Sequence, residues 1–287
     1  MSDEIIINLY QDYIDSIQDF FLKNGFTPDP NEEPLTTFIK FYNLELRSIS
    51  QKPRKVIQAQ NLSVPSQYTS VIDEIKRKAE AGELLDPHLS KRLLDLNYHD
   101  SLLNDWGLHH LHLSTNIGPS GFVDRTGPLL FARVTEDAFY LVAVLDHGNW
   151  TNKNLLEEIL SNWPKLLEPF EIIGIKPATS ISESEHATLR RKNVQTIVQL
   201  SNSKMYFPFG GGYTSSGANI NAVLQHDKLH ETLKRVEDDI RQTYKTREKE
   251  LQPGKSFGSP PTFRLLIHND DLIVVENHAK IGYRYSI

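Results

Sequence analysis

Apolar residues in the first third of the chain recur with the spacing of amphipathic helices. Positions three and four residues apart predict helices over about 6–24, 35–50 and 67–81. Asn24-Gly25 and Gly82 carry the glycine signals that end the first and third of these helices. Asp86-Pro87 then opens a shorter helix, because Asp is a good N-cap and Pro fits the first helical position.

The pattern changes near residue 100, where strand signals begin. Residues 108–114 alternate, which places His110 and His112 on one face of a strand. Segments 128–135 and 138–145 also read as strands, and the second is apolar throughout, as expected of a central strand buried on both faces.

A helix is expected after this sheet. Asn154 is predicted to cap a helix over 155–163, with Glu157 completing a capping box.

The last third mixes strands with one long helix. We expect a hairpin over 194–209, a helix over 227–249 and a terminal β-meander over 262–287, with a turn at Asn269-Asp270-Asp271. The glycine-rich segment 210–217 lacks a phosphate-loop motif, and we interpret it as a flexible surface loop.

The predicted fold class is therefore α+β. It has a helical N-terminal part, a central antiparallel sheet, a long helix and a C-terminal β-meander. The chain divides into regions 1–98, 99–180 and 181–287, of which the last two can form one domain.

Composition excludes several classes of protein. The 287 residues include 39% hydrophobic residues and no Cys, so disulfide scaffolds, thiol catalysis and cysteine-based metal sites are excluded. No apolar run approaches the ~20 residues of a membrane span. The acidic start of the chain lacks the basic segment of a signal peptide. We expect a cytoplasmic protein that does not contact the membrane.

Charge is distributed unevenly along the chain. Residues 1–35 hold eight acids and one Lys, a net charge of −7, so the remainder of a chain of net charge −6 carries +1. Cations gather in segments 40–60 and 186–204, and the candidates for drawing in a phosphate-bearing partner are Arg54, Lys55, Arg190 and Arg191. The alternative is a solvated surface balanced by acids elsewhere in the fold.

Three histidines lie within four positions. On a strand the imidazoles of His110 and His112 would lie ~6–7 Å apart, with His109 on the opposite face. Such a pair suits general acid–base catalysis at neutral pH, or it can ligate a metal ion. A metal site would need further ligands, which Asp105, Asp124, Asp146 or His147 can supply.

Two arginines and a polar strand end complete the candidate set. Arg125 precedes the strand at 128–135 and Arg133 lies on it; a guanidinium matches a phosphate bidentately. His147 belongs to the polar run 146–150, where the most apolar strand ends, and such positions often line a site.

Residues 108–159 resemble the core of RelE-type toxins, which belong with the barnase-like ribonucleases. That core has an arginine before one strand, then a buried strand ending in His-Gly, then a helix. Arg125, Arg133, His147 and Lys153 occupy roughly the matching places. This chain is longer and more acidic than those toxins, so only the chemistry is carried over. The resemblance implies metal-independent RNA cleavage, with His as base or acid and Arg on the phosphate.

Three hypotheses follow. The first is a ribonuclease-like effector of the toxin or phage-defence type that needs no cofactor. In it, His110 or His112 is the base, His109 or His147 the acid, and Arg125 with Arg133 holds the phosphate. RNA is then the substrate, and an antitoxin or another protein is a further partner. The second is a metal-dependent hydrolase with histidine ligands. The third is a non-enzymatic regulatory module whose histidines share no cleft.

Overall fold

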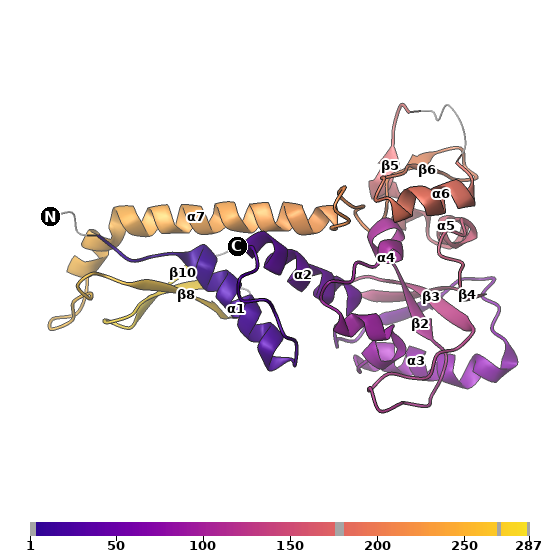
Figure 1. The fold of residues 1–287 in the computed structure, drawn as a ribbon, viewed down its shortest axis with the longest axis horizontal. Helices are drawn as coiled ribbons and strands as arrows, with labels where there is room; N and C mark the ends of the chain where they lie inside the picture. The colour runs from indigo at the N-terminus through magenta and orange to yellow at the C-terminus, as the bar shows by residue number, and fades with distance from the viewer. Residues whose placement is uncertain (1–3, 176–180, 269–270, 286–287) are drawn as a thin grey trace. The chain divides into compact units, whose positions relative to one another are not determined.

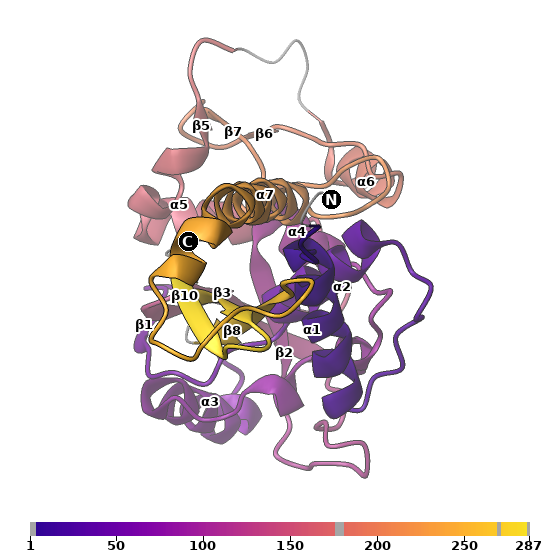
Figure 2. The same cartoon turned by 90° about the vertical axis from the view of Figure 1, so that its left-hand side faces the viewer.

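The computed structural model describes residues 4–175, 181–268 and 271–285. The chain forms two compact units, Met1–Ile39 with Val223–Ile287, and Lys40–Ala222 (Figures 1 and 2). The expected boundaries near residues 98 and 180 both lie within the second unit. No helix in the described ranges is long and apolar enough to span a lipid bilayer.

The first unit joins the two ends of the chain. It contains helix α1 (Leu9–Lys23), most of helix α7 (Ile220–Lys249) and a meander of β8 (Phe263–His268), β9 (Asp271–Glu276) and β10 (Ile281–Tyr285). The meander is antiparallel in the order β10-β9-β8, as predicted. Residues 269 and 270 of the expected turn lie outside the described residues.

Helix α1 begins later than the apolar pattern predicts. The side chain of Asn8 accepts a hydrogen bond from the backbone N–H of Gln11, which caps the helix at Leu9. Ile6 instead forms an isolated parallel bridge with Thr262. The core of this unit includes Leu9, Ile240 and Phe263, which pack together.

The second unit is built on a four-stranded sheet in the order β1-β4-β3-β2. Its strands are β1 (Lys55–Gln58), β2 (Leu108–His112), β3 (Pro128–Val134) and β4 (Ala138–Asp146). Strands β2, β3 and β4 pair antiparallel as expected, whereas β1 pairs with β4 in parallel and makes the sheet mixed. The pattern missed β1 because it is four residues long and both of its end residues are exposed.

Helices cover both sides of this sheet. Helix α3 (Thr69–Ala81) lies on one side, and α5 (Asn154–Asn162) with α6 (Glu183–Arg191) lies on the other, as Figures 1 and 2 both show. The α+β class is confirmed. The remaining elements are α2 (Pro34–Arg47), α4 (Ser101–Trp106), the small sheet of β5 (Glu171–Ile172), β6 (Val198–Gln199) and β7 (Met205–Tyr206), and 3-10 turns at Ser66–Tyr68, Asp86–His88, Lys91–Leu94, Pro164–Leu166 and Glu168–Phe170.

Two local predictions need correction. Asn154 is the first residue of α5 and not its cap, and the carboxylate of Glu157 accepts hydrogen bonds from the N–H and the hydroxyl of Ser201. The capping box belongs to α6, where Ser182 and Glu185 bond reciprocally.

The glycine-rich segment is packed where it begins. The N–H of Gly210 donates to the carbonyl of Asp105 at 3.0 Å, and the N–H of Gly212 donates to the carbonyl of Asn104 at 2.8 Å. The interpretation of this segment as a flexible loop is wrong for residues 210–212. They hold the C-terminal end of α4 in place, which matters because α4 lies beside the candidate site.

Candidate functional site

A cleft of about 450 Å³ opens in the second unit, beside the sheet. Side chains from β2, from the loop before β3, from the end of β4 and from α6 meet there. Its lining includes Asp100, His110, Arg125, His147, Trp150 and Arg191. Three of the predicted catalytic residues, His110, Arg125 and His147, therefore share one concave surface.

The backbone alternation of β2 places His110 in this cleft. Gly107 adopts a left-handed conformation (φ +61°), which ends α4 and lets β2 start at Leu108. His110 then pairs in register with Phe131 of β3. Its side chain is 14% exposed, and burial lowers its pKa below the usual value. His110 is consequently neutral at pH 7, which is the state a general base needs.

Trp150 packs against both cleft imidazoles. Its ring lies 4.8 Å from that of His110 and 4.9 Å from that of His147, measured between centroids. His147 is exposed and His110 is largely buried. The two imidazoles thus differ in solvent contact while they flank one indole.

A buried ion pair between Arg190 and Asp105 lies next to Trp150 in the wall of the cleft. The guanidinium of Arg190 lies 2.7 Å from Oδ2 of Asp105, and it also donates to the backbone carbonyl of Trp150. The same carboxylate oxygen lies 2.7 Å from Nε2 of His186, and Arg190 stacks over Trp106. Because the N–H groups of Arg190 already donate to Asp105 and to the carbonyl of Trp150, we assign Arg190 the role of holding Trp150 in position and no contact with a substrate.

The rim of the cleft is cationic. Arg92, Arg125 and Arg191 are exposed, and Asp100 is the one acid among the described residues that line the cleft. Arg92 also stacks over the ring of Tyr98 at 4.7 Å. Exposed guanidinium groups gathered around a concave surface favour a phosphate-bearing ligand.

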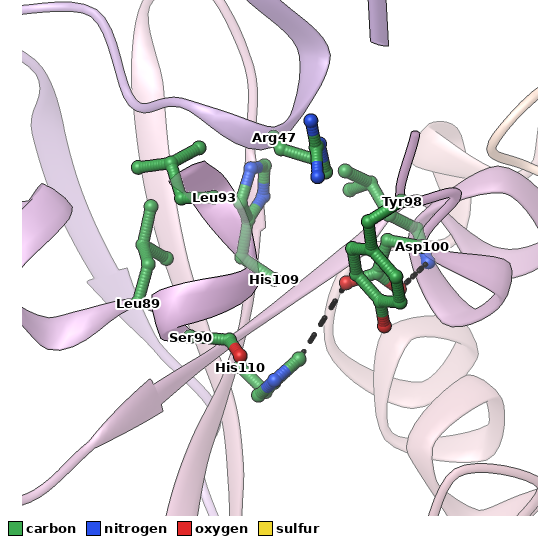
Figure 3. Close-up of a pocket in the computed structure, with 9 residues that line it drawn as sticks. Arg47, Leu89, Ser90, Leu93, Tyr98, Asp100, His109 and His110 are labelled. Carbon is green, nitrogen blue, oxygen red and sulfur yellow. Dashed lines mark hydrogen bonds and ion pairs between the residues drawn. The ribbon is translucent and has the colours of Figure 1, made fainter. Parts of the chain in front are cut away.

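Asp100 was not among the candidates from the sequence. It is the N-cap of α4, where Oδ1 accepts hydrogen bonds from the N–H groups of Leu102 and Leu103 at 3.0 Å. Its other oxygen lies 3.9 Å from Nδ1 of His110 (Figure 3). An Asp before a short apolar helix is a recognisable N-cap signal, but the pattern does not show which side chain lies opposite the second oxygen.

His109 and His112 lie away from the cleft. His109 is not among the residues that line the cleft, although it lines a separate small cavity of about 20 Å³ together with His110 (Figure 3). Its Nε2–H donates to the carbonyl of Leu46. His112 is buried, and its Nδ1 accepts from the N–H of Thr126 at 3.4 Å. Burial lowers the pKa of each of these histidines to about 4.

The remaining predicted residues also lie outside the cleft lining. The buried guanidinium of Arg133 donates to the carbonyl of Gly107, and that of Arg54 donates to the carbonyls of Ser50 and Thr135. Lys55 is exposed on β1, the edge strand opposite β2. Lys153 precedes α5. We therefore assign these four residues no contact with a substrate.

No three His, Asp or Glu side chains in ranges 4–175, 181–268 and 271–285 converge to hold a metal ion. Of the ligands considered for such a site, Asp105 is engaged by Arg190 and His186, and Asp124 accepts from the amide of Asn116. The arrangement gives no support to the metal-dependent hypothesis.

No family model matches this chain, and no curated protein or solved structure is significantly similar to it. The geometry of the cleft is therefore the feature that indicates a function for this chain.

Proposed function

We propose that this protein is a ribonuclease-like effector that cleaves RNA in the cleft without a metal ion. The observation that carries the proposal is the shared position of two imidazoles and one arginine: His110, His147 and Arg125 line the same concavity. Its volume falls within the range of about 300–1,000 Å³ that is typical of small-molecule sites. One nucleotide unit with its phosphate is therefore the expected occupant.

The chemistry is a transfer of the phosphoryl group within the RNA strand. His110 accepts the proton of a ribose 2′-OH, and the resulting oxygen attacks the neighbouring phosphorus. The bond from phosphorus to the 5′-oxygen breaks, and protonated His147 gives its proton to that oxygen. The products are a 2′,3′-cyclic phosphate end and a 5′-OH end.

Arg125 stabilises the charge that develops on the phosphate. A guanidinium donates two parallel hydrogen bonds to phosphate oxygens, and this interaction strengthens as negative charge accumulates. Arg92 and Arg191, exposed at the rim, hold flanking phosphates. The toxin or phage-defence role follows from the RelE-type resemblance, and growth arrest on expression of the wild-type chain is its expected result.

A cleavage assay on unstructured RNA in buffer with EDTA tests the proposal. His110→Gln should lower kcat by about 10²-fold or more, because general base catalysis contributes about 10²–10⁴-fold. His278→Gln is the matched control, since His278 is an exposed residue of the first unit.

The rival hypotheses give different results in this assay. Full activity of His110→Gln would overturn the proposal. RNA binding by the wild-type protein without any cleavage would favour the regulatory module. Activity that disappears with EDTA and returns with a divalent metal would favour the metal-dependent hydrolase.

A further inference from the structure

One nitrogen of His110 has no hydrogen-bond partner among the described residues. Its Nδ1 is buried, and the nearest carboxylate oxygen is Oδ2 of Asp100, 3.9 Å away (Figure 3). A buried polar atom without a partner destabilises the fold. The side chains of both residues are nearly buried, at 14% and 13% exposed, so water screens their interaction weakly.

Asp100 is held rigidly in front of this nitrogen. Its Oδ1 accepts hydrogen bonds from two backbone N–H groups at the start of α4, those of Leu102 and Leu103. These two bonds hold Oδ1 in place and leave Oδ2 for His110. Hydrogen bonds in catalytic sites are often long in the free enzyme and shorten when the substrate binds.

We propose that Asp100 is the positioning residue for His110, accepting a hydrogen bond from its Nδ1–H. A neutral imidazole carries one proton, and an ionised carboxylate only accepts hydrogen bonds. Asp100 therefore selects the tautomer protonated at Nδ1. Nε2 is then left without a proton and can accept one from a substrate bound in the cleft that His110 lines. The inference rests on the proposed function and assigns Asp100 no contact with RNA.

The groups around His110 give this role an electrostatic signature. Burial lowers the pKa of His110, Asp100 raises it, and His147 and Arg125 lower it further. Removing the Asp100 carboxylate should therefore lower the pKa of His110 further. The acid limb of the rate profile would move to lower pH while the maximal rate falls, a combination that a purely structural role would not produce.

Two substitutions separate the cap of α4 from the orientation of His110. Asp100→Ser and Asp100→Asn both retain a good N-cap residue, so α4 should still begin at Ser101. Thermal unfolding of each variant checks the fold. The main measurement is the ¹⁵N chemical shifts of the His110 ring, which report the tautomer in the free protein.

The wild-type protein should show the proton at Nδ1, and both variants should shift it toward Nε2. In the cleavage assay both variants should lose about 10- to 100-fold in kcat, the usual cost of removing an orienting partner, with KM little changed. Unchanged tautomers and rates in well-folded variants would overturn the inference. The tautomer measurement needs no RNA cleavage, so an inactive wild-type protein would contradict the proposed function and still leave Asp100 tested.

Discussion

Arg190 and Arg191 are neighbours in the sequence with opposite environments. Arg190 is buried against Asp105, whereas Arg191 is exposed at the rim of the cleft. Breaking a buried ion pair by removing one partner typically costs about 3–5 kcal/mol, because the other charge stays buried. The basic segment 186–204 was recognisable from the sequence, but the burial of one of its arginines depends on the tertiary fold.

Arg190→Met should therefore lower the free energy of unfolding by about 3–5 kcal/mol. Arg191→Met should change it by less than about 0.5 kcal/mol, as is usual for surface substitutions, and should weaken RNA binding. Urea unfolding and a binding titration measure the two effects. Equal losses of stability in both variants would contradict this assignment of roles.

His109 gives the fold a dependence on pH. Burial lowers its pKa to about 4, while in the unfolded chain the usual value of about 6.5 applies. Below about pH 6.5 His109 becomes protonated in the unfolded chain, whereas in the folded chain it stays neutral down to about pH 4. Stability that is present at pH 7 is thus lost as the pH falls, by about 3 kcal/mol for this group.

His109→Gln should reduce the loss of unfolding free energy at acid pH. The unfolding free energy of the variant should fall less between pH 7 and pH 4.5 than that of the wild-type protein, by about 2 kcal/mol. Urea unfolding at the two pH values checks the difference, with His278→Gln as the control. An identical fall in the variant and the wild-type protein would show that His109 does not titrate in this way.

The alternation of residues 108–114 was sufficient to predict that His110 and His112 share a face, and their rings lie 6.4 Å apart. It could not show that one of them is at the cleft and the other is buried. A local pattern also could not predict the interaction of Asp100 with His110, because the two are ten positions apart in the chain with α4 between them.

At the scale of elements, α4 depends on a glycine far along the chain. A Cβ at Gly210 would collide with the carbonyl oxygens of Leu103 and Asn104. Because backbone atoms of a helix cannot yield easily, Gly210→Ala should destabilise the protein by about 1–3 kcal/mol, the usual cost of overpacking. It should also lower cleavage activity, since Asp100, the N-cap of α4, faces His110.

Gly127→Ala is the matched control, because a Cβ there meets no atom within 4 Å and its φ is not left-handed. Thermal unfolding of both variants checks the prediction, and equal stability of the two would contradict it.

Long amphipathic helices and the meander were predictable from periodicity. The parallel strand β1 was not, because its two apolar residues carry too little pattern.

At the scale of the whole molecule, net charge and local charge have opposite signs. The chain carries −6 overall, yet three exposed arginines surround a cleft whose described lining holds one acid. Local patterns could not predict this gathering, since Arg92, Arg125 and Arg191 come from distant segments. Local sequence patterns also could not predict that the first and last segments of the chain belong to one compact unit.

Binding of RNA should consequently weaken with salt despite the net negative charge. For three phosphate contacts on a single strand, the logarithm of the binding constant should fall with the logarithm of salt concentration with a slope of about −2. The slope should decrease in magnitude by about 0.7 in Arg191→Met, which removes one contact. Titrations of a non-cleavable 2′-deoxy oligonucleotide at several salt concentrations measure it. A binding constant independent of salt would contradict the role of these arginines.

The most direct test of the account is the chemistry of the cut ends. An oligonucleotide with a single ribose among deoxyriboses is incubated with the wild-type protein in a buffer that contains EDTA. The masses of the products are then measured by mass spectrometry. We predict one cut, 3′ of that ribose, with a 2′,3′-cyclic phosphate on one fragment and a 5′-OH on the other, and loss of this cut in His110→Gln. An intact oligonucleotide, or a cut that does not require the ribose, would contradict the assignment of His110 as the base.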